Sequence, residues 1–187
     1  MRWADLTALI AAVLWLGANL AIAFVPAVMF PEANIIGEGP AGVLLLREQV
    51  GEMFGQVLLH FMTCSAVLAG LFLIARVWGW TIRLQRGTFH RTSLIGVVVL
   101  VGVLTCFAGA WSAVVEVDDL RVASEIASDK EAPDAEAIRH RFEVAHKQSM
   151  NVFVALTALL AVSATLLAVS LARRDHPLPA SSPPAAP

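Results

Sequence analysis

Four polar side chains with metal-binding or proton-transfer chemistry recur every four residues along one stretch of the chain. These are Glu52, Gln56, His60 and Cys64, and residues spaced by four share one face of an α-helix. Imidazole titrates near neutral pH and ligates metals, and thiolates favour soft metals such as copper(I). His60, Cys64 and Cys106 are therefore a candidate zinc or copper(I) site, although only three ligands are present.

The same region predicts a polar layer inside a helical bundle. Four of its five members lie eight or nine residues from the expected outer end of their segments, at a depth of roughly 12–14 Å. The layer consists of Asn19, Gln56, His60, Cys106 and Thr157, with Gln56 one turn from His60. Such groups hydrogen-bond between helices and fix their packing. The alternative is a site for a small ligand, a proton or a metal.

A third group of polar residues falls at the outer ends of three segments. Glu52, Glu116 and His146 occupy these positions. They predict either a hydrogen-bonded lock between helices or a vestibule that attracts cations.

The elements that must position these residues are four uncharged runs, at 6–31, 53–75, 92–115 and 148–172. Each can cross the roughly 30 Å apolar core of a bilayer, which takes about 20 helical residues. With 58% hydrophobic residues in 187, the chain is expected to form one membrane domain. The predicted fold is all-α, an integral membrane four-helix antiparallel bundle.

The expected spans are 5–28, 52–76, 92–115 and 148–172, within a membrane domain of residues 1–175. Pro26 and Pro31 are expected to end the first span, because proline breaks or kinks a helix. Apolar residues continue at helical spacing around 116–147, which predicts that spans three and four extend outward as a hairpin, with Asp134 as an N-cap. Residues 176–187, rich in Pro, Ala and Ser, are expected to be disordered.

Arginine density predicts the orientation. The side with both termini carries seven of the thirteen basic residues, and four of these arginines lie within 76–91. Basic residues beside spans favour the cytoplasm, so both termini are expected there, in a bacterial inner membrane. The alternative for the first span is a secretory signal cleaved after Ala21-Ile22-Ala23.

The segment between spans two and three combines those arginines with Trp78 and Trp80. Tryptophan sits well at a membrane interface and arginine reaches toward headgroups. The composition favours an interfacial anchor. A lipid-headgroup or anionic-ligand site is the alternative.

Several short motifs lie along the chain: Trp15-Leu16-Gly17 with Pro26 and Phe30, Ala41-Gly42 with Gly51 and Phe54, Leu120-Arg121, and Phe142 with His146 and Ser149. Together they resemble the transmembrane protein 205-like family, also known as domain of unknown function 4149. The resemblance implies a four-helix membrane protein without an established biochemical activity.

The sequence favours a non-enzymatic integral membrane protein, either transporter-like or accessory, with an intramembrane polar layer. One alternative is a metal or redox-cofactor protein centred on His60, Cys64 and Cys106. Another is a structural subunit that binds a partner through the outer hairpin. The expected partners are the lipid bilayer and either another protein or a second copy of the chain. No cofactor and no nucleic acid are expected.

Overall fold

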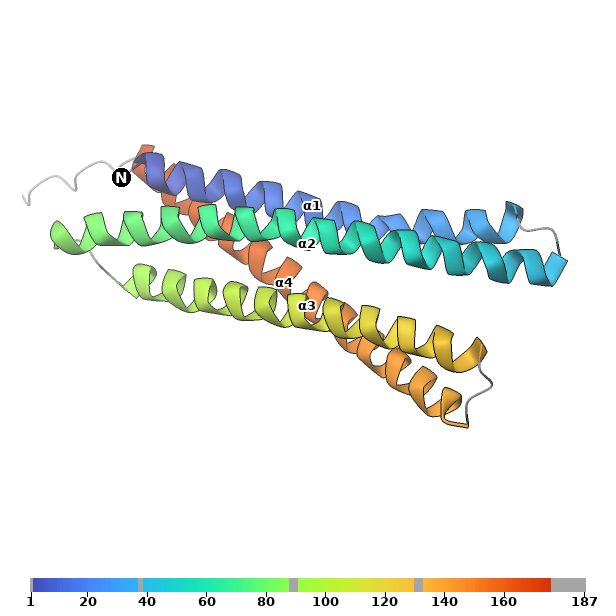
Figure 1. Ribbon diagram of the computed structural model, residues 1–187. Coiled ribbons are helices and arrows are strands. Elements are labelled where there is room, and N and C mark those ends of the chain that lie inside the picture. Colours follow the sequence, from blue (N-terminus) through green and yellow to red (C-terminus); the bar gives the residue numbers. More distant parts are fainter. Residues whose placement is uncertain (1, 37–38, 88–90, 130–132, 176–187) are drawn as a thin grey trace, which may run out of the picture.

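The computed structural model describes residues 2–36, 39–87, 91–129 and 133–175, which form four long helices (Figure 1). They are α1 (Arg2–Ile36), α2 (Gly39–Gln85), α3 (Arg91–Asp129) and α4 (Ala135–Asp175). Successive helices run in opposite directions, so the first residues of α1 and the last of α4 lie at one end. We call this the terminal end and the opposite one the distal end. The prediction of an all-α four-helix antiparallel bundle is confirmed.

All four helices are long and apolar enough to cross a membrane. Large apolar side chains cover their outer faces, including Val67, Val98 and Val154, which are among the most exposed. A water-soluble protein of this size rarely exposes apolar surface so widely. This surface is compatible with direct contact with lipid chains.

The first helix does not end at its prolines. The α1 helix continues through Pro26 and Pro31 to Ile36, and α2 begins at Gly39. The prolines therefore do not end the helix, and the predicted end of the membrane span beside them stays a prediction. A proline removes one backbone hydrogen bond, but long membrane helices tolerate that loss when neighbouring groups compensate for it.

Helices α3 and α4 extend beyond their uncharged runs, as the sequence predicts for the hairpin. The α3 helix reaches Asp129, and α4 starts at Ala135. The Asp134 carbonyl accepts the hydrogen bond of the Ile138 amide at 3.0 Å, which is the backbone pattern of an N-cap residue. The predicted disordered tail at 176–187 lies outside the described residues.

The helices pack as two pairs, α1 with α2 and α3 with α4. Contacts between α1 and α4 join the pairs, whereas α2 and α3 touch much less. Figure 1 shows the two pairs close together at the terminal end and diverging toward the distal end. The core is filled by Trp15, Met62, Phe72, Val103, Leu156 and Leu160 together with several alanines of α1. Small residues let helices approach closely where lipid offers no hydrophobic contrast.

Candidate functional site

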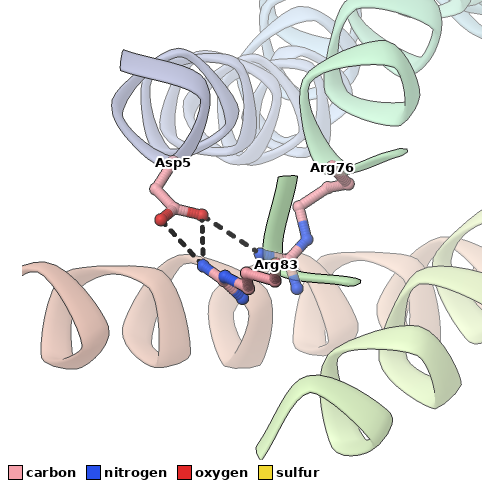
Figure 2. A network of polar contacts seen from close by, with 3 residues as sticks. All are labelled: Asp5, Arg76 and Arg83. Atoms are coloured by element: carbon pink, nitrogen blue, oxygen red, sulfur yellow. Dashed lines mark hydrogen bonds and ion pairs between the residues drawn. The ribbon is translucent and has the colours of Figure 1, made fainter. Parts of the chain in front are cut away.

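A buried ion pair joins α1 to α2 at the terminal end. Both carboxylate oxygens of Asp5 accept hydrogen bonds from Nη2 of Arg83, at 2.7 and 2.8 Å. Asp5 is 2% exposed and Arg83 is 8% exposed. Figure 2 shows the Asp5 carboxylate pointing toward two guanidinium groups. A buried charge is strongly disfavoured without such a partner, so this pair fixes the two helices relative to each other.

The second guanidinium belongs to Arg76, two turns along α2. Its Nη1 lies 4.0 Å from Asp5 Oδ1, and its side chain is only 10% exposed. The guanidinium also lies over the Trp80 ring, with its central carbon 4.9 Å from the ring centroid. This arrangement is a cation–π contact. We call Asp5, Arg76, Trp80 and Arg83 the basic cluster.

Two glycines lie against the basic cluster. A Cβ at Gly79 would lie 3.5 Å from Asp5 Oδ1 and 3.7 Å from the Ala4 Cβ, so α1 already reaches ordinary contact distance there. A Cβ at Gly96 of α3 would overlap the Arg76 guanidinium, whose central carbon would be 3.6 Å away. The absence of a side chain at Gly96 therefore lets Arg76 lie between α2 and α3.

Sequence reasoning placed these arginines in an interfacial loop, but they belong to α2 and face the interior. Met62, Ala69, Arg76 and Arg83 recur every seven positions along α2, and in the structure all but the partly buried Arg76 are buried. A seven-residue repeat marks the seam between packed helices, and here the seam continues past the apolar run. Trp78, in contrast, is exposed, as an interfacial anchor would be.

Further along the core, three buried polar atoms have no hydrogen-bond partner. They are Trp15 Nε1, Asn19 Oδ1 and Ser65 Oγ. The Asn19 amide nitrogen donates to the Trp15 carbonyl at 3.1 Å. Asn19 lies about four turns from Asp5 along α1, and Ser65 lies about four turns from Gly79 along α2. Because the helices are antiparallel and Gly79 faces Asp5, Asn19 and Ser65 lie at the same level. We call these three residues the polar core.

The predicted polar layer is only partly assembled. Asn19 is buried, and Cys106 and Thr157 are partly buried, with Thr157 donating to its own helix at the Phe153 carbonyl, 2.8 Å away. Gln56 and His60 are exposed. The interior face of α2 at this depth carries Ser65, because its buried seam runs through Met62 and Ser65 and leaves the other polar stripe outside.

The structure does not assemble the candidate metal site. His60 and Cys64 are exposed on α2, and Nδ1 of His60 lies 2.8 Å from the Gln56 carbonyl oxygen of its own helix. Cys106 lies partly buried on α3. Among the described residues, no three His, Cys, Asp or Glu side chains converge as metal ligands would. Zinc needs such convergence, since its structural sites are almost always tetrahedral.

At the distal end, Glu52, Glu116 and His146 are all exposed. His146 stacks on Phe142 with ring centroids 6.0 Å apart, and its carbonyl accepts a hydrogen bond from Ser149 Oγ at 2.7 Å. Helices α2 and α3 come close beside Gly55, where an added Cβ would lie 3.5 Å from Asp118 Oδ1.

Comparisons with known proteins found no matching family model, no matching curated protein and no matching solved structure. The resemblance of the short motifs to the transmembrane protein 205-like family therefore stays a prediction. The basic cluster and the polar core are the two groups of buried polar residues that could bind a ligand.

Proposed function

We propose that the chain is a non-enzymatic integral membrane protein, transporter-like or accessory, whose polar core binds a small hydrogen-bonding molecule. The observation that carries this proposal is the set of unsatisfied polar atoms at Trp15, Asn19 and Ser65. All three residues are at most 2% exposed.

Leaving such atoms unsatisfied is expensive in an apolar bundle. A buried donor or acceptor without a partner costs about 1–3 kcal/mol, so most are satisfied by protein or by ordered water. Trp15 offers a donor, Asn19 an acceptor and Ser65 a hydroxyl that does both. Water, or a small solute with one donor and one acceptor, matches this set.

The proposed orientation follows from the arginines at the terminal end. Positive charge next to spans is retained in the cytoplasm, which supports a bacterial inner membrane with both termini inside. The basic cluster would then lie at the level of the inner headgroups. The polar core would lie about 20 Å deeper, since about four helical turns separate the two.

Cysteine accessibility tests the proposal. In a Cys64→Ala/Cys106→Ala background, Ser65→Cys in membranes is treated with the water-soluble reagent aminoethyl methanethiosulfonate. The matched control is Met62→Cys, one turn away on the same buried seam and 1% exposed. We expect Ser65→Cys to react at least about tenfold faster, because polar neighbours admit water where apolar ones do not. Equal rates, or no reaction at either position, would show that the polar core is closed packing and contradict the proposal.

A further inference from the structure

We propose that the basic cluster is a binding site for a phosphate group, with Arg76 and Trp80 as its donors. This inference goes beyond the polar core and does not depend on it. The chemistry required is that of a tetrahedral oxyanion, carried either by an anionic lipid headgroup or by a soluble phosphate compound.

The first observation is that Arg76 has no hydrogen-bond acceptor in the part of the chain that the structure describes. Its nearest carboxylate oxygen, Asp5 Oδ1, is 4.0 Å away, beyond hydrogen-bond distance. Both oxygens of that carboxylate already accept hydrogen bonds from Arg83. A guanidinium has five N–H donors, and this side chain is only 10% exposed.

The second observation is independent and lies beside the first. Nε1 of Trp80 is buried and has no partner, and the Trp80 ring is the one that Arg76 covers. Two chemically different donors thus lie close together without an acceptor. A phosphate has several acceptor oxygens, and arginine binds it through two parallel N–H groups.

The third observation concerns position. The Arg76 guanidinium fills the space that a side chain at Gly96 would occupy, and Ser93, one turn from Gly96 along α3, is also buried. Asp5 precedes the first uncharged run and Arg76 follows the second. The basic cluster therefore lies where the apolar layer ends, which is the level of lipid phosphates.

The test uses the full-length protein in nanodiscs of phosphatidylcholine containing phosphatidylglycerol, then transferred to dodecyl maltoside. Native mass spectrometry measures the retained phosphatidylglycerol. We expect Arg76→Gln to lower retention about tenfold or more, since hydrogen bonds to charged groups are the strong ones. The matched control is Arg86→Gln, which removes an exposed arginine at the same end and should retain the lipid. Equal retention by the wild type and Arg76→Gln, or an equal loss in Arg86→Gln, would overturn the proposal.

A second variant keeps the test valid if Arg76→Gln does not fold. Trp80→Phe preserves an aromatic ring under the guanidinium and removes only the unpartnered N–H. It should weaken retention about fivefold, as expected for one lost hydrogen bond. Unchanged retention in Trp80→Phe would contradict its role as a donor.

Inorganic phosphate then separates the two sources. If millimolar phosphate displaces phosphatidylglycerol from the wild type, the site takes free phosphate compounds. If the lipid stays bound while Arg76→Gln still loses it, the site takes a lipid headgroup.

Discussion

Carboxylate–guanidinium pairs occur at both ends of the bundle, but they connect different parts of it. At the terminal end, Asp5 and Arg83 are 78 residues apart, lie on different helices and are both buried. At the distal end, two ion pairs among the described residues each lie within a single helix. Asp118 and Arg121 are three residues apart at 3.1 Å, and Arg139 and Glu143 are four apart at 3.8 Å.

Solvent separates the two cases further. The Arg139 and Glu143 side chains are 75% and 54% exposed, so their attraction is weakened by water and salt. The Asp5–Arg83 pair is buried, so water and salt weaken its attraction much less. Losing one partner would leave a buried charge without a counterion. The ion pair at the terminal end therefore joins two helices, whereas the two described pairs at the distal end each lie within one helix.

Removing the terminal carboxylate should have the largest effect. Asp5→Ala leaves the buried Arg83 guanidinium without its bidentate acceptor and should destabilise the protein by about 3–5 kcal/mol. Unfolding by dodecyl sulfate, followed by circular dichroism, measures this loss. A loss of unfolding free energy smaller than that of Glu143→Ala would show that the buried pair at the terminal end is not the more important of the two.

Geometry at the same pair should matter less than its charge. Arg83→Lys keeps the positive charge but replaces the planar guanidinium with a single ammonium on a shorter side chain. We expect a loss of about 1–3 kcal/mol, the value of a hydrogen bond to a charged group. The same unfolding assay checks it, with the exposed Arg86→Lys as control. A loss as large as that of Asp5→Ala would mean that a lysine ammonium cannot replace the guanidinium as the donor to Asp5.

Alanine substitutions at two glycines compare a position with open space around it and one that Arg76 fills. Gly70→Ala meets open space and should stabilise α2 by about 0.5–1 kcal/mol through helix propensity. Gly96→Ala should lose that gain because the new methyl group displaces the Arg76 guanidinium, a difference of about 1–2 kcal/mol between the variants. Thermal unfolding of the two proteins side by side measures it. Equal shifts would show that Arg76 moves aside freely.

The smallest effect is expected from the exposed distal pair. Glu143→Gln removes one ion of an i,i+4 pair on a helix surface and should cost no more than about 0.3–0.5 kcal/mol. The difference should vanish at high salt. A salt-independent loss would show that this pair contacts something other than solvent.

The sequence predicted the fold because lipid leaves the backbone few choices. Four uncharged runs in an apolar solvent must satisfy their own N–H and C=O groups, and helices do so within each segment. The hairpin of α3 and α4 was also predicted, since apolar residues continue at helical spacing between residues 116 and 147. The uncharged runs did not reveal that α1 continues past Pro26 and Pro31, since proline often breaks or kinks a helix.

The sequence alone did not determine which polar side chains face inward. In water, apolar residues mark the buried face of a helix, but lipid is as apolar as a protein core and that contrast disappears. His60, a plausible interior residue by depth, lies outside, whereas Asn19 lies inside. Arg76 and Arg83 look like headgroup anchors by type, and only the packing of α2 against α1 turns them toward Asp5. Composition thus determined the helices, and helix rotation within the bundle decided the site.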